Sequence, residues 1–273
     1  MRILSGIAAA AWLLATGAFA ADLPAYTRAP MFVDPVFNWT GFYVGGNIGY
    51  SWGRSSDSST LTNTAGTVLF TSTGTTDLNG VVGGGQIGYN WQIQNWVWGL
   101  EADIQGTNEK GTRDFICSAG VCVPTPPAIL APVVGIPVPV ALNQKIDWFG
   151  TVRGRAGVLA TPALLLYATG GLAYGEVDSN ATIGAASTAF ANTGATSFGW
   201  TAGAGIEGMI GGGWTARLEY LYVDLGRVNG SFLTTINAFG GGVLSANYSS
   251  HITDNIVRMG INYKFNSPVV ARY

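Results

Sequence analysis

Eight segments of this sequence alternate apolar and polar residues, and this two-residue period limits the possible folds more than any other feature. The last segment places four apolar residues on one face, and these are Met259, Ile261, Tyr263 and Phe265. Successive side chains of a β-strand point to opposite faces, so the alternation predicts strands rather than helices. The eight predicted strands are Gly41–Ser51, Val81–Gln92, Trp96–Gln105, Ile146–Val158, Leu164–Gly175, Ser197–Met209, Trp214–Leu225 and Val257–Phe265.

The composition indicates that these strands face lipid. Charged residues make up 10% of the chain and hydrophobic residues 48%, whereas soluble domains carry about 25% charged residues. After the N-terminal segment there is no uninterrupted apolar run of the ~18 residues that a membrane helix needs, and the nearest candidate, 124–142, is rich in proline. A lipid-facing chain without membrane helices must close a sheet on itself, so that every backbone N–H and C=O is paired. The sequence therefore predicts an all-β fold, an eight-stranded antiparallel transmembrane β-barrel.

The N-terminus has the features of a secretory signal. Arg2 precedes a short apolar run, and Ala18–Ala20 supplies a small-residue cleavage site. We expect a cleaved signal peptide at residues 1–20, a periplasmic leader at 21–38, the barrel at 39–265 and a short extension at 266–273. Export together with a barrel places the protein in the outer membrane of a Gram-negative bacterium. The formal net charge of −2 is too small to suggest nucleic acid as a partner.

The connections between the strands predict their orientation. Tight turns alternate with long loops: the turns lie at 94–95, 160–162 and 211–213, and the loops at 53–80, 106–145, 176–196 and 226–250. Short turns at one end and long loops at the other are typical of outer-membrane barrels, with the turns and both termini in the periplasm. Aromatic residues fall near both ends of the apolar faces, as expected for girdles at the two membrane interfaces.

On the inward face of the predicted strands four acids meet four bases, and these are Glu101, Asp103, Arg153, Arg155, Glu207, Arg217, Glu219 and Arg258. The same parity places Asp147 inside. An arginine facing lipid costs roughly 2–4 kcal/mol near the midplane, so the interior is the natural place for these charges. The interior of an eight-stranded barrel is just wide enough for side chains to fill it, and Arg–carboxylate pairs satisfy one another there. We therefore expect a plug of neutralised ion pairs, with a narrow ion path through rearranging pairs as the alternative.

Three further features carry weaker signals. Cys117 and Cys122 are the two cysteines of the chain, and in an oxidising periplasm a pair on one loop predicts a disulfide. Gly203–Gly208 fits G-x-G-x-x-G, but the strand alternation runs through it where a nucleotide site needs a helix, which favours small residues in a crowded wall. His251, the single histidine, is expected to be a solvated rim residue rather than a catalytic or haem-binding one. No cofactor, metal site or catalytic residue is predicted.

Several motifs, spread over the whole mature chain, carry a resemblance to a known family. They are Asn38–Tyr50, Val152–Gly157, Arg217–Tyr220 and Gly260–Phe265. The pattern resembles the small, porin-like outer-membrane proteins of alphaproteobacteria of the Brucella and rhizobial type. The resemblance implies a barrel like the transmembrane domain of OmpA, with roles in envelope integrity and in host or surface interaction. It also implies a C-terminal assembly signal, for which the residues here are Gly260, Ile261, Tyr263, Phe265 and Tyr273.

Together these observations predict a structural, non-enzymatic outer-membrane barrel with a closed lumen. The alternatives are a narrow porin-like channel for small solutes or ions, a surface adhesin that uses its long loops, and a lipid-modifying enzyme that uses His251. The loop segment 123–140, which is apolar and rich in proline, is the candidate adhesive surface. The expected partners are outer-membrane lipid and lipopolysaccharide, the barrel-assembly machinery with periplasmic chaperones, and a host or surface ligand at the loops. We expect a monomer.

Overall fold

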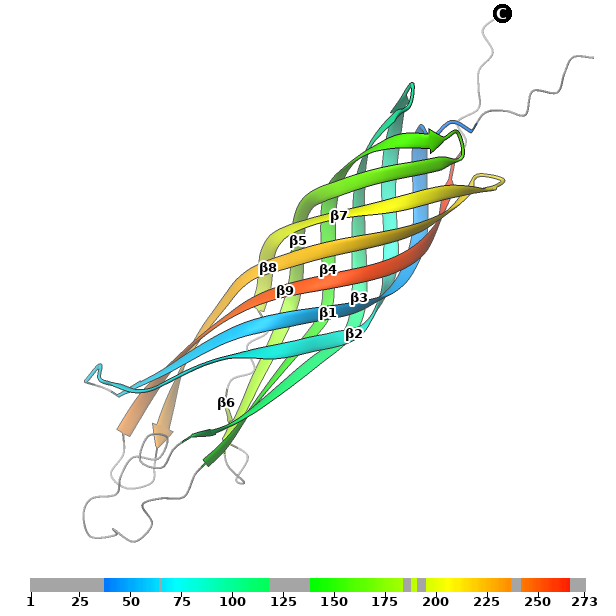
Figure 1. Ribbon diagram of the computed structural model, residues 1–273. Helices are drawn as coiled ribbons and strands as arrows, with labels where there is room; N and C mark the ends of the chain where they lie inside the picture. The colour runs from blue at the N-terminus through cyan, green and yellow to red at the C-terminus, as the bar shows by residue number, and fades with distance from the viewer. Residues whose placement is uncertain are drawn as a thin grey trace, which may run out of the picture. The chain divides into compact units, whose positions relative to one another are not determined.

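A ring of eight long antiparallel strands forms the structure (Figure 1). The computed structural model describes residues 37–63, 65–117, 138–183, 188–190, 195–236 and 242–265. No helix long and apolar enough to cross a membrane occurs among these residues. A short additional strand, β6 (Thr188–Phe190), pairs with the outer end of β5. The long strands are β1 (Gly41–Asn63), β2 (Val68–Ile93), β3 (Trp96–Cys117), β4 (Val138–Thr161), β5 (Leu164–Ile183), β7 (Ala195–Gly211), β8 (Trp214–Ile236) and β9 (Gly242–Lys264).

Strands β1 and β9 close the ring. They are paired from Tyr43↔Lys264 to Asn63↔Leu244, so the first and last strands are in contact along nearly their whole lengths. The remaining neighbours in the ring follow chain order, and β5 pairs with both β4 and β7. Closure removes the free strand edges that a sheet in lipid cannot leave unpaired. The predicted eight-stranded antiparallel barrel is confirmed.

Tight turns join the strands at one end of the barrel, as predicted. β2 turns into β3 through Gln94, which has a φ of 55°. β7 turns into β8 through Gly211–Gly213, whose φ angles are 126°, 59° and 86°. Residues with a side chain rarely adopt such angles, so this turn requires glycine. The chain also leaves the barrel at this end, where the backbone N–H of Phe265 donates to the carbonyl of Phe42 over 2.9 Å.

At the opposite end the strands continue far beyond the predicted boundaries. In the range 53–80, predicted as a long loop, residues 53–63 and 68–80 belong to β1 and β2, which stay paired from Gly53↔Leu78 to Leu61↔Phe70. The loop prediction was wrong because serine and threonine replace the apolar residues on the outward face of these strands. The hydropathy period therefore disappears, although the pleat of the strands continues. The other long connections are shortened in the same way, since β3 reaches Cys117 and β8 reaches Ile236.

A β-bulge in β4 changes which of its residues face the lumen. The pairing with β5 shifts between Ile146 and Trp148, so that Ile146 is buried inside the barrel and Trp148 lies outside. Asp147 does not point inward, as the alternation predicts, but pairs with Lys145 on the outer surface. This prediction was wrong because a bulge inserts one residue that a strict two-residue count does not anticipate.

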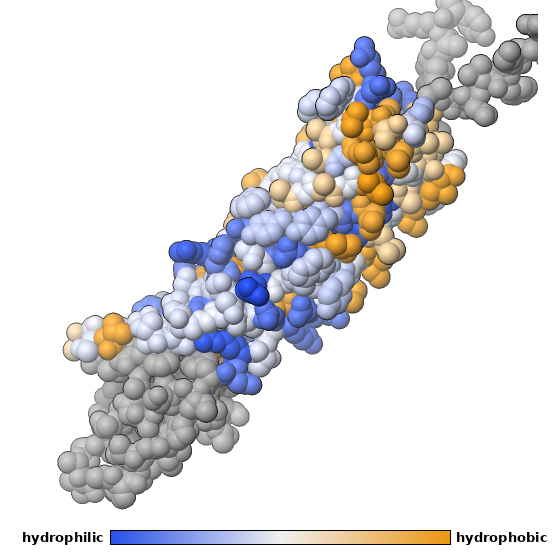
Figure 2. All heavy atoms as spheres, viewed as in Figure 1, coloured by the Kyte–Doolittle hydropathy of each residue, from blue (hydrophilic) through white to orange (hydrophobic). Residues whose placement is uncertain are grey.

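A band of exposed apolar side chains surrounds the half of the barrel nearer the tight turns. Ile48, Leu100, Leu172 and Met259 are examples, each more than half exposed. Figure 2 shows this apolar surface near the turns and a hydrophilic surface over the outer half of the strands. An apolar band with polar surface beyond it is the expected exterior of a barrel in a membrane.

Aromatic side chains form two rows at the borders of this band. Near the turns, the ring centroids of Trp214 and Tyr263 are 5.0 Å apart, and toward the outer end those of Trp148 and Tyr174 are 6.0 Å apart. Aromatic rings of this kind lie at membrane–water interfaces, so the two rows mark the membrane borders. The inner aromatic row contains Phe42, Tyr89, Trp91, Trp96, Trp98, Trp214, Tyr263 and Phe265, and the outer aromatic row contains Tyr50, Trp52, Trp148, Tyr174, Phe198, Trp200, Tyr220 and Tyr222.

Candidate functional site in the barrel lumen

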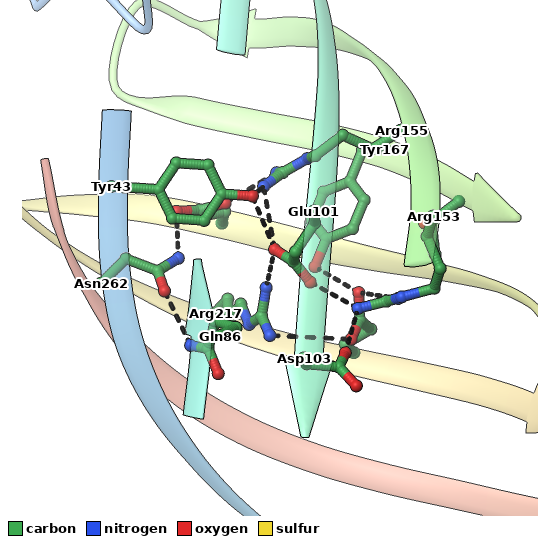
Figure 3. Close-up of polar contacts among 12 residues, drawn as sticks. Tyr43, Gln86, Glu101, Asp103, Arg153, Arg155, Tyr167, Arg217 and Asn262 are labelled. Atoms are coloured by element: carbon green, nitrogen blue, oxygen red, sulfur yellow. Dashed lines mark hydrogen bonds and ion pairs between the residues drawn. The ribbon is translucent and has the colours of Figure 1, made fainter. Parts of the chain in front are cut away.

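The eight charged residues predicted for the inward face meet inside the barrel (Figure 3). Their side chains are at most 3% exposed. They project from β3, β4, β7, β8 and β9. We call this group the charge cluster, and its members are Glu101, Asp103, Arg153, Arg155, Glu207, Arg217, Glu219 and Arg258.

Strand pairing places acids directly opposite bases. Three such cross-strand pairs belong to the charge cluster, namely Glu101↔Arg153, Glu207↔Arg217 and Glu219↔Arg258. Residues opposite one another in an antiparallel ladder have Cβ atoms about 4.5–5.5 Å apart. The sequence therefore builds complementary charge into the register of the sheet itself.

Other contacts of the charge cluster cross the lumen. Arg153 on β4 reaches Glu219 on β8, with 3.1 Å between Nη1 and Oε1, and its Nη2 contacts Glu101 and lies 2.9 Å from Oδ2 of Asp103. Arg258 on β9 donates from Nη2 to Asp103 on β3 over 2.8 Å and from Nε to Glu219 over 2.7 Å. The Arg153–Glu219 and Arg258–Asp103 bonds join strands that are not neighbours in the sheet, so these two bonds span the interior. The other bonds join the neighbouring pairs β3–β4 and β8–β9.

The charges in the cluster balance one another. Nη2 of Arg155 lies 2.7 Å from Oε2 of Glu207, and Nη1 of Arg217 lies 2.5 Å from Oε2 of Glu101. A buried ion is costly unless it is paired and hydrogen-bonded. Four acids against four bases balance the charge of the set, and the loss of any one member leaves its partner unpaired. The hydrogen bonding is incomplete, since five buried polar atoms of the set have no hydrogen-bond partner among the described residues: Oδ1 of Asp103, Nε of Arg155, Nε and Nη2 of Arg217, and Nη1 of Arg258.

Two tyrosines complete the arrangement. Tyr43 donates from Oη to Oε2 of Glu101 over 2.6 Å and accepts from Nη1 of Arg155 over 3.2 Å. Tyr167 donates to Oε1 of Glu219 over 3.0 Å, and the Arg155 guanidinium carbon lies 4.1 Å from the centroid of the Tyr167 ring. A cation over an aromatic face is stabilised by the ring quadrupole. The alternation places both tyrosines inward, but residue type alone does not predict that they bind the charge cluster.

An apolar layer fills the lumen beyond the charge cluster, toward the outer end. On β8 the change occurs along one face, because Arg217 and Glu219 are followed at the same spacing by Leu221 and Val223. The alternation does not predict this layer, because at this level both faces of the strands are apolar or aromatic and the period is lost. The apolar layer consists of Leu78, Val82, Ile146, Phe149, Ala173, Val177, Leu221, Val223, Leu225, Val228, Ile252 and Ile256.

A polar layer crosses the lumen still further out. Asp57 on β1 accepts hydrogen bonds from Ser55, Thr76 and Gln144, each over 2.8 Å. Gln144 belongs to β4 and also donates to Ser250 on β9 over 3.2 Å. Because β4 is adjacent to neither β1 nor β9 in the ring, these bonds hold distant walls of the outer barrel together.

Two buried carboxyl groups, Glu109 and Asp254, interact electrostatically just beyond the outer aromatic row. Asp254 lies opposite Gly53, one residue past Trp52, and therefore outside the apolar band. Burial raises the pKa of Glu109 to about 8, with a further increase from the neighbouring Asp254 charge. Burial likewise raises the pKa of Asp254 to about 6. The pair therefore holds one proton at neutral pH, on Glu109.

We expect the outer barrel to lose stability as the pH rises toward 8. Because the folded pKa of Glu109 lies above its ordinary value of 4.5, the contribution is fully present below that value and is lost as the pH passes about 8. The variant Glu109→Gln should not show this loss. Hydrogen–deuterium exchange of the outer residues of β3 and β9, corrected for intrinsic exchange, measures it. The same pH dependence in both proteins would contradict the assignment of this proton to Glu109.

The segment Phe37–Thr40, which we call the periplasmic cap, packs into the lumen at the end with the tight turns. Trp39 is 1% exposed and packs against Leu165 and Tyr167. Its indole N–H donates to the carbonyl of Pro162 over 3.2 Å. The sequence predicts a leader up to residue 38 and gives no sign that its end enters the barrel.

The other predicted residues lie apart from the lumen. Nε2 of His251 is 3.0 Å from Oδ1 of Asp224, and the histidine side chain is 39% exposed on the outer surface. The G-x-G-x-x-G segment, Gly203–Gly208, lies within β7, and the strand continues through it. No group of three or more histidine, cysteine or acidic residues in the described part of the chain has the arrangement of a metal site.

The predicted disulfide and assembly signal involve residues outside the described ranges. Cys117 is the last residue of β3, but Cys122 lies in the undescribed segment 118–137. Gly260, Ile261 and Tyr263 belong to β9, whereas Tyr273 is not described. The signal peptide and the C-terminal extension also fall outside the described residues. All of these remain predictions.

A closed antiparallel barrel with an apolar outer band and two aromatic rows defines an outer-membrane β-barrel protein. The chain belongs to the outer membrane protein beta-barrel domain family, whose model matches residues 7–265. It is 37% identical to the 31 kDa outer-membrane immunogenic protein of Brucella melitensis biotype 1, covering 96% of this chain and 98% of that protein. It is 31% identical to the 22 kDa outer membrane protein of Rhizobium leguminosarum bv. viciae, covering 85% and 81%.

Among solved structures, the outer membrane protein OprG from Pseudomonas aeruginosa is similar, with a TM-score of 0.44 and 13% identity over 84% of this chain and 99% of that one. The sequence relatives are named as outer-membrane proteins of Gram-negative bacteria. Family membership and these relatives together place the protein in the outer membrane.

Proposed function

We propose that this protein is a structural, non-enzymatic component of the outer membrane whose filled lumen keeps the membrane sealed where the barrel crosses it. The observation that supports the proposal is that buried side chains occupy the lumen at four successive levels: the periplasmic cap, the charge cluster, the apolar layer and the polar layer around Asp57. A barrel of this kind contributes protein mass and a rigid surface to the envelope without a pore.

The physical barrier to a channel is large at two of these levels. Opening the charge cluster requires breaking several charge-assisted hydrogen bonds, each worth about 1.5–3 kcal/mol. Opening the apolar layer requires exposing side chains that are now nearly fully buried, Leu221 and Ile256 among them. A narrow ion path through the charge cluster alone does not suffice, because the apolar layer lies in the same lumen.

We expect no stable single-channel conductance from the refolded protein in planar lipid bilayers. The variant Arg153→Ala should also stay closed, because the periplasmic cap and the apolar layer remain in place. A known open porin, inserted in the same membranes, serves as the positive control. A reproducible conducting level in the wild-type protein would overturn the closed lumen and favour the narrow channel instead.

Binding of a host or surface ligand remains a prediction, because most of the loop 123–140 lies outside the described residues. Two further features also remain predictions: the recognition of β9 by the assembly machinery and chaperones, and the monomeric state.

A further inference from the structure

Three adjacent strands, β8, β9 and β1, carry an ordered series of side chains on their outward face. Cross-strand pairing places Trp52 and Tyr222 on either side of Asn255 at the outer aromatic row. The following rows, moving away from the membrane, are Arg54–Thr253–Asp224, Ser56–His251–Arg227, Ser58–Ser249–Asn229 and Thr60–Asn247–Ser231. The surface thus changes from aromatic through charged to neutral and polar.

The two outermost of these rows line a hollow of about 380 Å³. Its floor includes Gly230 and Tyr248, and the Tyr248 hydroxyl turns away into the lumen, 2.7 Å from Oγ of Ser179. Among the described residues, the six lining side chains have no hydrogen-bond partner. We call this hollow the hydroxyl–amide groove, and it is lined by Ser58, Thr60, Asn229, Ser231, Asn247 and Ser249.

The chemistry of the groove fits a sugar better than a charged or apolar ligand. Each asparagine amide both donates and accepts, and each serine or threonine hydroxyl does the same. Neighbouring hydroxyl groups on a sugar ring offer the same two functions at similar spacing. The six lining side chains carry no charge that would select a phosphate or a cation.

Two exposed guanidinium groups lie between the groove and the membrane. Arg54 is 3.4 Å from Asp77, but the two side chains are 66% and 70% exposed, so this ion pair is weak and easily exchanged. Arg227 is exposed on β8, in the row directly below the groove. Guanidinium groups bind phosphate through two parallel hydrogen bonds.

The heights of these groups match the layers of a glycolipid. Ser58 is six residues beyond Trp52 along β1. With a rise of about 3.3 Å per residue and a strand tilt of about 40°, Ser58 lies about 15 Å above the membrane interface. Arg54 is two residues beyond Trp52, or about 5 Å above it on the same geometry. The lipopolysaccharide of the outer leaflet presents acyl chains, phosphates and core sugars in this order.

We propose that the outward face of β8, β9 and β1 binds one lipopolysaccharide molecule lengthwise. Its phosphate contacts Arg54 and Arg227, and its core sugars occupy the hydroxyl–amide groove. This inference is independent of the closed lumen, because every side chain that it assigns to the ligand lies on the outer surface.

The test measures binding of two purified probes to the full-length mature protein in detergent micelles, by native mass spectrometry. The probes are lipopolysaccharide with a complete core and deep-rough lipopolysaccharide, which keeps the phosphates but lacks the outer core sugars. Asn229→Ala/Asn247→Ala should weaken binding of the complete form about tenfold, as expected for two lost hydrogen bonds, and leave the deep-rough form unchanged. Arg54→Gln/Arg227→Gln should weaken binding of both forms about tenfold.

Matched controls lie on the outward faces of β3 and β4. Thr112→Ala/Asn143→Ala removes a hydrogen-bonded polar pair there, and Lys110→Gln removes an exposed charge. Neither should change binding of either probe, and every variant must keep the heat-modifiable gel mobility of a folded barrel. Should a double variant fail to refold, the single variants Asn247→Ala and Arg54→Gln, with about threefold expected losses, decide the same question.

If Asn229→Ala/Asn247→Ala bound lipopolysaccharide with a complete core as tightly as the wild-type protein does, the sugar site would be overturned. Equal weakening of both probes by that variant, or equal weakening by the control variants, would overturn it as well. Unchanged binding by the arginine variant would overturn the phosphate contact.

Discussion

Replacing Arg153 with alanine is expected to lower the free energy of unfolding of the barrel by about 3–5 kcal/mol. The side chain is fully buried and contacts three carboxylates, those of Glu101, Asp103 and Glu219. Its removal leaves buried negative charge without a partner, and that desolvation is not compensated. Urea unfolding of the refolded protein in lipid vesicles, followed by tryptophan fluorescence, measures the loss.

Arg54→Ala is the matched control for this prediction. Arg54 also faces a carboxylate, that of Asp77, but both side chains are mostly exposed, so the expected loss is below about 1 kcal/mol. Adding Glu219→Gln to Arg153→Ala should recover part of the lost stability, because it removes an acid that has lost its partner. Similar losses for Arg153→Ala and Arg54→Ala would show that the charge cluster does not hold the barrel together.

Replacing Phe149 with alanine is expected to lower the free energy of unfolding by about 3–5 kcal/mol through a different mechanism. Phe149 is 3% exposed and belongs to the apolar layer, so truncation leaves a cavity that the rigid barrel wall cannot fill. The same urea titration applies.

Leu172→Ala provides the comparison for Phe149→Ala. Leu172 is 68% exposed on the outward face of the barrel, which lipid covers in the membrane. Acyl chains fill the space that the truncated side chain leaves. The expected loss is about 1 kcal/mol or less. If both variants lost the same stability, the apolar layer would not be a packed core.

The sequence predicts the membrane part of this fold because lipid and lumen impose opposite chemistry on alternate residues. Along β3, Leu100 and Ala102 face outward while Glu101 and Asp103 face inward, and hydropathy alone separates them. The same parity brings the four acids and four bases to one interior. It does not say that Arg153 contacts Glu219 across the lumen, because that depends on the diameter of the ring and on rotamers.

The hydropathy pattern does not predict the extended outer strands, the apolar layer, the bulge or the periplasmic cap, and the physical reason differs for each. Outside the membrane the outward face is polar, so the hairpin between Gly53 and Gly80 looks like a loop. Inside the apolar layer both faces are apolar, so residues such as Leu221 show no period. The bulge at Asp147 shifts the two-residue alternation by one position. Trp39 enters the barrel from a segment whose sequence has no strand pattern.

The charge cluster also has a consequence for how the sheet finds its correct pairing. A slip of one residue in β4 would turn Arg153 and Arg155 from the lumen to the lipid, since successive side chains face opposite sides. Each misplaced arginine would cost roughly 2–4 kcal/mol near the midplane, in addition to the carboxylates left unpaired inside. A register shifted by one residue therefore costs more free energy in this barrel than it would in a barrel with an apolar interior. The buried charges therefore stabilise the native register of the strands relative to registers that are shifted by one residue.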